Sequence, residues 1–182
     1  YEVSYEQQRL LDNLVDLEIE AIDRIIEKVK NDPEKDRYKR IEIETWENLK
    51  EAGKKYRRTG GGFTALGDML ASLGLEYGSD KANEVVDKVM GVKMEGEWDA
   101  SVDLSVERGS FHEWDAEYDT TNFFDFLEEE YPEIYERNKN YGRRNISLST
   151  VAPTGSVSLM SKICGDYGTT SGVEPLFSTE EN

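Results

Sequence analysis

The stretch RNISLSTVAPTGSVSLM, residues 144–160, decides the fold. Its residues 145–152 alternate apolar and polar side chains and become rich in β-branched residues, which predicts a β-strand. Pro153 would end that strand, because proline has no N–H group to donate to a sheet. Apolar residues resume at Val157, so we expect a helix to follow the turn.

The turn at residues 153–156 has the composition of an anion site. Gly155 would let a ligand approach the backbone closely, and Thr154, Ser156 and Ser158 would supply hydroxyl groups. A helix that starts at Ser156 would add free N–H groups and the positive end of its dipole. Taken alone, these residues leave two interpretations open: a phosphate or pyrophosphate site, and a small polar turn without a ligand.

Length and charge restrict the class of protein. The 182 residues are enough for one domain with a core, and 22 basic against 39 acidic residues give a net charge of −17. Such a field repels nucleic acid and anionic membranes. Since no apolar run approaches the roughly 20 residues of a membrane span, we expect a soluble cytoplasmic protein. The start at Tyr1, in the middle of a helical pattern, suggests an excerpt of a longer chain.

The hydrophobic pattern predicts four or five helices before residue 145. The first would be capped by Ser4, and the fourth, capped by Ser79, would be either one kinked helix or two. A charged loop is expected at residues 33–40. The predicted helices cover residues 4–31, 41–58, 63–73, 80–108 and 122–140.

The glycine cluster at residues 60–62 invites a nucleotide-binding interpretation. Gly60, Gly62 and Ala65 fit G-x-G-x-x-A, and Glu84 follows about 20 residues later. However, a basic helical segment precedes the cluster where the dinucleotide motif requires a strand. We therefore favour a tight turn between helices.

Other reactive residues have plainer interpretations. His112 has no second histidine at i+4 and is expected to be a surface or capping residue, not a zinc ligand. Cys164 is the only cysteine, which excludes an internal disulfide, and a buried thiol is favoured over a nucleophile because no histidine is near it in sequence. The glycosylation pattern at Asn145 is attributed to chance.

Three stretches, in the same order, resemble the catalytic large subunit of ribonucleotide reductase, and most of all its adenosylcobalamin-dependent class II. Together they span most of the chain. They are RLLDNLVDLEI (9–19), RRTGGGFTALGDMLASLGLEYGSDKA (57–82), and GRRNISLSTVAPTGSVSLM (142–160) followed by TTSGVEPLF (169–177).

The resemblance implies an α/β fold, namely a helix-rich segment from the C-terminal half of the family's ten-stranded α/β barrel, incomplete on its own. Residues 1–182 would form part of a single catalytic barrel domain. Residues 1–142 would be mainly helical, and residues 143–182 would hold the strand, the phosphate-binding loop and the following segment.

The resemblance also implies a function, the reduction of ribonucleotides to deoxyribonucleotides by radical chemistry, as DNA replication requires. Adenosylcobalamin would be the cofactor, bound mostly outside this segment. The partners would be a ribonucleoside di- or triphosphate and the rest of the reductase chain or a split partner, and the full enzyme would be an oligomer. The substrate phosphates would be held by Pro153, Thr154, Gly155, Ser156, Val157 and Ser158.

The family's catalytic groups are not in this sequence. In that family a thiyl radical from an Asn-x-Cys-x-Glu loop abstracts the ribose 3′ hydrogen, a glutamate acts as base, and a cysteine pair reduces the substrate. No such loop occurs here, so we assign no catalytic residue or metal ligand and expect no turnover by this segment alone. The link SKICGDY, residues 161–167, looks longer than usual, which leaves open how closely residues 172–174 return to the phosphate loop.

Two alternatives remain open. The first is a non-catalytic split or truncated reductase fragment that acts only by binding a partner chain, which an exposed apolar face along residues 10–29 would favour. The second is an unrelated phosphate-binding helical protein.

Overall fold

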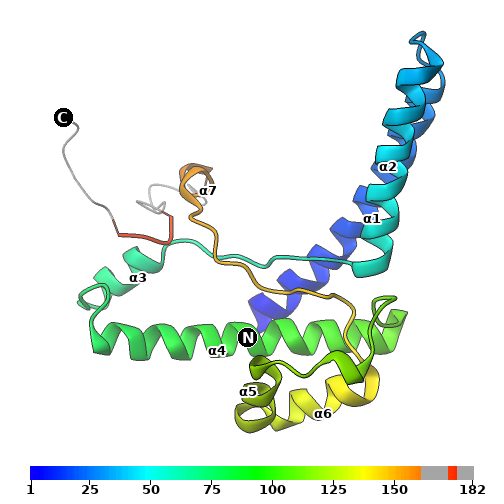
Figure 1. The fold of residues 1–182 in the computed structure, drawn as a ribbon. Helices are drawn as coiled ribbons and strands as arrows, with labels where there is room; N and C mark the ends of the chain where they lie inside the picture. The colour runs from blue at the N-terminus through cyan, green and yellow to red at the C-terminus, as the bar shows by residue number, and fades with distance from the viewer. Residues whose placement is uncertain (161–171, 176–182) are drawn as a thin grey trace, which may run out of the picture. The chain divides into compact units, whose positions relative to one another are not determined.

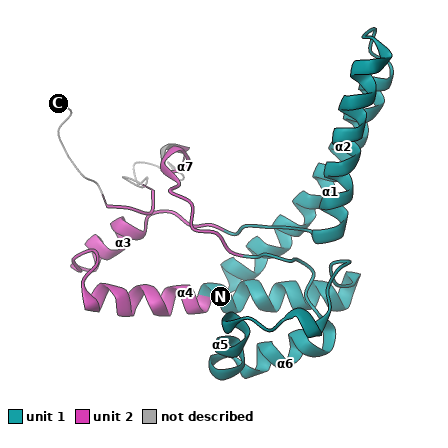
Figure 2. Ribbon diagram, in the orientation of Figure 1, with its two compact units in different colours: residues 1–61, 93–148 teal, residues 62–92, 149–182 magenta. Residues whose placement is uncertain are grey.

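The computed structural model describes residues 1–160 and 172–175. Its helices are shown in Figure 1 and are α1 (Glu2–Lys30), α2 (Asp36–Tyr56), α3 (Leu66–Ser72), α4 (Asp80–Arg108), α5 (Asn122–Glu130), α6 (Pro132–Tyr141) and α7 (Gly155–Met160), with a short 3-10 helix at Ala116–Tyr118. The chain forms two compact units, residues 1–61 with 93–148 and residues 62–92 with 149–182 (Figure 2). Among the described helices, none has both the length and the apolar character to cross a bilayer.

The first unit begins with α1 and α2, which lie side by side as a hairpin (Figure 1). Both predicted helices are confirmed, but their starts differ from the prediction. Helix α1 begins at Glu2, with Tyr1 as N-cap and no side-chain cap, so the capping role given to Ser4 is wrong. Helix α2 begins at Asp36, inside the predicted charged loop, where an acidic first residue suits the positive end of the helix dipole.

The face of α1 that is buried carries apolar residues at helical spacing. These are Val15, Ile22, Ile26 and Val29. A second set of apolar residues on α1, Leu10, Leu14 and Leu17, is exposed, each at 47% or more. Apolar side chains therefore lie on the buried face of α1 and also on a part of its surface that its own unit leaves exposed.

Helix α4 is a single helix from Asp80 to Arg108, so the alternative of two helices is wrong. The hydroxyl of Ser79 caps it by accepting from the N–H of Ala82 at 3.3 Å. The predicted helix over residues 122–140 is instead two helices, α5 and α6. They divide before Pro132, because proline lacks the N–H and crowds the preceding turn, and it starts α6 at its first position.

An aromatic and aliphatic core joins the second half of α4 to α5 and α6. It consists of Trp98, Phe124, Leu127, Ile134 and Leu148. The buried guanidinium of Arg143 lies 5.2–5.4 Å from the centres of three rings, those of Trp98, Phe111 and Phe124. It also donates to Asp119 at 2.6 Å, so its charge is paired inside an apolar environment.

The strand predicted over residues 145–152 is not a regular strand, and the described residues contain no strand element. Residues 146–148 instead run parallel to residues 56–61. The N–H groups of Ile146, Thr59 and Gly61 donate to the carbonyls of Tyr56, Ser147 and Leu148 at 3.1, 3.1 and 2.6 Å. A single pair of extended segments lacks the further strands that make a regular sheet. The same pairing shows that the glycine cluster is extended, not the tight turn that was expected.

The second unit contains α3, the first part of α4, α7 and the segment at residues 172–175. Leu70 of α3 and Ala82 of α4 are buried, as is Val173. Cys164, for which a buried thiol was expected, lies outside the described residues. His112, in the first unit, is exposed, and no cluster of His, Cys, Asp or Glu among the described residues could hold a metal ion.

Helix α4 offers a matched test of the core of the first unit. Val102 is fully buried and Val106, four residues later, is 62% exposed. Val102→Ala should lower the free energy of unfolding by about 2 kcal/mol, because it removes buried methyl groups and leaves a cavity. Val106→Ala should change it by less than about 0.5 kcal/mol. Urea unfolding of the two variants measures the difference, and equal effects would contradict the packing described here.

Candidate functional site

The loop at residues 153–158 contains a strained residue. Thr154 has φ 54°, in the left-handed region, which is unfavourable for a β-branched side chain. Helix α7 follows directly, and its first turn is closed by two bonds from Ser158: the N–H donates to the carbonyl of Thr154 at 2.9 Å and the hydroxyl to that of Gly155 at 2.6 Å. The loop thus holds Thr154 in a conformation that costs about 1–3 kcal/mol.

The hydroxyl of Thr154 is buried and, among the described residues, has no hydrogen-bond partner. A buried hydroxyl without a partner costs about 1–3 kcal/mol, so native structures usually avoid it. Strain and an unsatisfied hydroxyl at the same residue indicate a functional constraint, because packing alone would favour neither.

The segment at residues 172–175 packs directly on this loop. The N–H of Val173 donates to the carbonyl of Pro153 at 3.2 Å. A Cβ atom on Gly172 would lie 1.8 Å from the same carbonyl oxygen, so only glycine fits there. The sequence left open whether residues 172–174 return to the loop, and the structure brings Gly172 and Val173 into contact with it. Glu174 is exposed.

A third segment, at residues 65–67, supports residues 172–175 from the start of α3. The N–H groups of Ala65 and Gly67 donate to the carbonyls of Gly172 and Val173 at 2.9 and 3.1 Å. A Cβ atom on Gly67 would lie 2.8 Å from the backbone of Pro175. The sequence analysis did not predict that residues 65–67 contact residues 172–175. The small residues Ala65 and Gly67, two positions apart, are the pattern that could have indicated close backbone contact.

The six residues predicted to hold phosphate are therefore contiguous and supported from two other segments. Gly155, Ser156 and Val157 are exposed, whereas Ser158 is 4% exposed and its hydroxyl donates within the loop. Among the described residues, nothing lies within 4 Å of a Cβ atom placed at Gly155. The arrangement offers hydroxyl and backbone N–H donors, so chemically it can bind an anion by hydrogen bonds.

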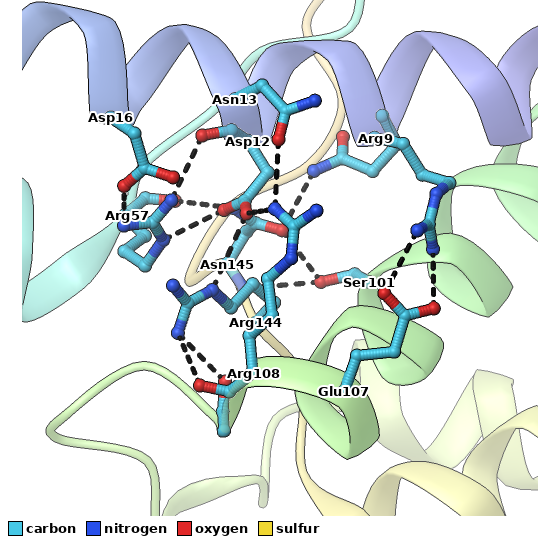
Figure 3. A network of polar contacts seen from close by, with 12 residues as sticks. Arg9, Asp12, Asn13, Asp16, Arg57, Ser101, Glu107, Arg108, Arg144 and Asn145 are labelled. Carbon is cyan, nitrogen blue, oxygen red and sulfur yellow. Dashed lines mark hydrogen bonds and ion pairs between the residues drawn. The ribbon is translucent and has the colours of Figure 1, made fainter.

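The first unit is held by a polar network around Asp12, a fully buried residue of α1 (Figure 3). One carboxylate oxygen accepts from Arg57 Nε at 2.8 Å and from Asn145 Nδ2 at 2.9 Å. The other faces Arg108 and Arg144 at 3.3 and 3.5 Å. Asp12 therefore joins α1 to the end of α2, the end of α4 and the start of the stretch that leads to the loop.

Asn145 is the second centre of this network and is also fully buried. Its side-chain oxygen accepts from Gln8 at 2.9 Å and from the hydroxyl of Ser101 at 3.0 Å. The backbone N–H of Asn145 donates to the same hydroxyl at 3.2 Å. Its amide nitrogen also donates to the carbonyl of Arg57 at 3.0 Å. These bonds fix the position of the chain at residue 145, and no acceptor role in glycosylation is compatible with its burial.

The charge of Asp12 is favoured in the folded state. Burial raises the pKa of Asp12, but the hydrogen bond and positive charge of Arg57, followed by Asn145 and Arg144, lower it by more in total. The pKa of this carboxyl group therefore lies below its ordinary value, and Asp12 is ionised at neutral pH.

The chain belongs to the ribonucleotide reductase family. The sequence model of that family's barrel domain matches residues 3–182. A vitamin B12-dependent ribonucleoside-diphosphate reductase of Mycobacterium tuberculosis (strain CDC 1551 / Oshkosh) is 31% identical over 130 residues, 71% of this chain and 15% of that protein. The protein of the same name from Thermoplasma acidophilum is 30% identical over 132 residues, 72% of this chain and 14% of that protein. The chain thus spans about 15% of the length of these relatives, and the resemblance to this family is confirmed.

Removing the central carboxylate should be far more damaging than removing its exposed neighbour. Asp12→Ala leaves Arg57 buried without its main partner, so we expect the free energy of unfolding to fall by about 3–5 kcal/mol. Asp16 pairs with the same guanidinium at 2.8 Å, but its side chain is 50% exposed. Asp16→Ala should therefore cost less than about 1 kcal/mol. Urea unfolding of both variants tests this, and similar losses would refute the central role of Asp12.

The network should also weaken in acid. Because the pKa of Asp12 is lowered on folding, its stabilisation is complete above the unfolded value, about 3.9, and is lost as pH falls through the folded value. Asp12→Asn should therefore destabilise the protein most near pH 7, and its deficit relative to wild type should shrink below about pH 4. Unfolding measured from pH 7 to pH 3 checks this, and a deficit that stays constant would contradict it.

Proposed function

We propose that this chain is part of a ribonucleotide reductase catalytic subunit and supplies the site that binds the phosphates of the substrate. The observation that carries the proposal is Thr154, with its left-handed backbone and buried hydroxyl that lacks a partner among the described residues, inside the Pro-Thr-Gly-Ser loop. A bound phosphate would accept a hydrogen bond from that hydroxyl and so offset its cost.

The six residues have different roles in this proposal. Pro153 ends the extended segment and offers its carbonyl to Val173, while Thr154 contributes its hydroxyl. Gly155, Ser156 and Val157 contribute main-chain N–H groups, since the first turn of a helix leaves these without helical acceptors. Ser158 keeps the turn closed through its bonds to Thr154 and Gly155.

The proposed substrate is a ribonucleoside diphosphate, in agreement with the names of the relatives in Mycobacterium tuberculosis and Thermoplasma acidophilum. The reaction exchanges the 2′-hydroxyl of the ribose for hydrogen and releases water, with two electrons from a dithiol that becomes a disulfide. The chain has a single cysteine, so the dithiol and the radical cysteine must come from residues beyond this sequence. Its own part is to bind and orient the nucleotide.

Adenosylcobalamin is the cofactor we propose for the complete enzyme, since the relatives are named as vitamin B12-dependent. When bound, it would supply the radical. We assign none of the described residues to it, and propose that it binds mostly outside this segment. The ten-stranded α/β barrel, completed by further chain, and an oligomeric enzyme in the cytoplasm belong to the same proposal.

One observation also fits the alternative, a split or truncated reductase fragment that acts by binding a partner chain. The exposed side chains Leu10, Leu14 and Leu17 on α1 are spaced four and three residues apart, as on one helix face. Such a face is normally covered, either by the rest of the same chain or by a separate one. The mass of the native polypeptide that contains residues 144–160 distinguishes the two: a chain several times longer supports the complete reductase.

A charge placed in the loop should abolish nucleotide binding without unfolding the protein. Gly155→Asp puts a carboxylate beside the proposed phosphate position, and we expect affinity for a ribonucleoside diphosphate to fall roughly 100-fold or more. A Cβ atom at Gly155 meets no atom of the described part of the chain within 4 Å, so the fold should tolerate the change. Isothermal titration calorimetry on the complete enzyme measures the affinity.

Two controls separate charge from bulk in that experiment. Gly155→Ala adds only a Cβ atom, and Gly155→Asn has the shape of aspartate without its charge. Both should bind the nucleotide much better than Gly155→Asp. Unchanged affinity in Gly155→Asp would sink the assignment of the phosphate to this loop.

A further inference from the structure

Three buried side-chain polar atoms have no hydrogen-bond partner among the described residues: Thr64 Oγ1, Thr154 Oγ1 and Trp114 Nε1. Buried polar groups are nearly always satisfied, so each exception calls for a physical reason. Two of the three are threonine hydroxyls, and both belong to the second unit. Thr154 is already part of the proposed phosphate loop, whereas Thr64 has no role in it.

The backbone brings the two threonines to the same glycine. Ala65, next to Thr64, donates its N–H to the carbonyl of Gly172 at 2.9 Å. The Cα of Gly172 also lies so close to Pro153, the residue before Thr154, that a Cβ atom on Gly172 would be 1.8 Å from the carbonyl oxygen of Pro153. Each hydroxyl is therefore one residue away from a backbone atom that contacts Gly172.

We propose that Thr64 is a second substrate-binding residue, whose hydroxyl donates to a phosphate oxygen of the same ribonucleoside diphosphate that Thr154 binds. This inference rests on the phosphate site proposed above and adds a residue that no motif indicated. A diphosphate carries several acceptor oxygens, so one ligand can satisfy two donors that come from separate segments. The same ligand then explains both hydroxyls at once, which a polar turn without a ligand does not.

The test compares variants that keep or remove the hydroxyl. Thr64→Val keeps the shape of the side chain but has no donor, and we expect the dissociation constant for a ribonucleoside diphosphate to rise roughly 10- to 100-fold in the complete enzyme. Thr64→Ser keeps the donor and should stay within about threefold of wild type. The control is Thr150→Val, the same change at an exposed threonine of the same unit, which should leave binding unchanged.

A second measurement, the unfolding temperature without nucleotide, separates binding from structure. Because the hydroxyl of Thr64 has no partner among the described residues, Thr64→Val should unfold at the same temperature as wild type or higher. Adding nucleotide should then raise the unfolding temperature of this variant less than that of wild type. A drop in the nucleotide-free protein would mean that the hydroxyl has a structural partner, and it would overturn the inference.

The other outcomes separate this inference from the proposal on which it rests. If Gly155→Asp loses nucleotide affinity while Thr64→Val binds like wild type, the phosphate loop stands and the role of Thr64 is wrong. If neither variant loses affinity, both are wrong. An equal loss in Thr64→Val and Thr150→Val would indicate a general disturbance of the unit and would also overturn the role of Thr64.

Discussion

The ionised carboxylate of Asp12 is the constraint on which the first unit depends. A buried charge is tolerated only when it is paired and hydrogen-bonded, and Asp12 meets this condition through Arg57 and Asn145, with Arg108 and Arg144 nearby. These partners come from three separate parts of the chain, the end of α2, the end of α4 and the stretch at residues 144–145. The buried charge of Asp12 is therefore satisfied only when α1 and these three parts are assembled together.

Close backbone contacts join three segments of the second unit. Gly67 and Gly172 let the segment at residues 172–175 approach both the start of α3 and the loop at Thr154, where any side chain would clash. These contacts and the hydrogen bond from Ser158 hold Thr154 in its strained backbone conformation. In the proposed phosphate site, a loop fixed in this way would keep its donors in place before a ligand arrives, which would lower the entropic cost of binding.

The sequence allowed the helices and the family to be predicted, because both depend on local patterns. Helix α4 has the predicted bounds, and Ser79 caps it as expected. The strand at residues 145–152 failed because strand pairing depends on neighbours that a local pattern does not contain. Asp12 lay within the helix predicted over residues 4–31, and Thr64 within the helix predicted over residues 63–73, and neither prediction gave these residues a role of their own. The burial of Asp12 depends on partners 45 or more positions away, such as Arg57 and Asn145, and the residue that follows Thr64, Ala65, bonds to the distant Gly172.

The most direct test of the central claim is a structure of the complete enzyme with a bound ribonucleoside diphosphate. We expect phosphate oxygens within hydrogen-bond distance, about 3.5 Å or less, of the hydroxyl of Thr154 and of the N–H groups at residues 155–157. Density for the diphosphate at another place, with the loop at residues 153–158 empty, would contradict it.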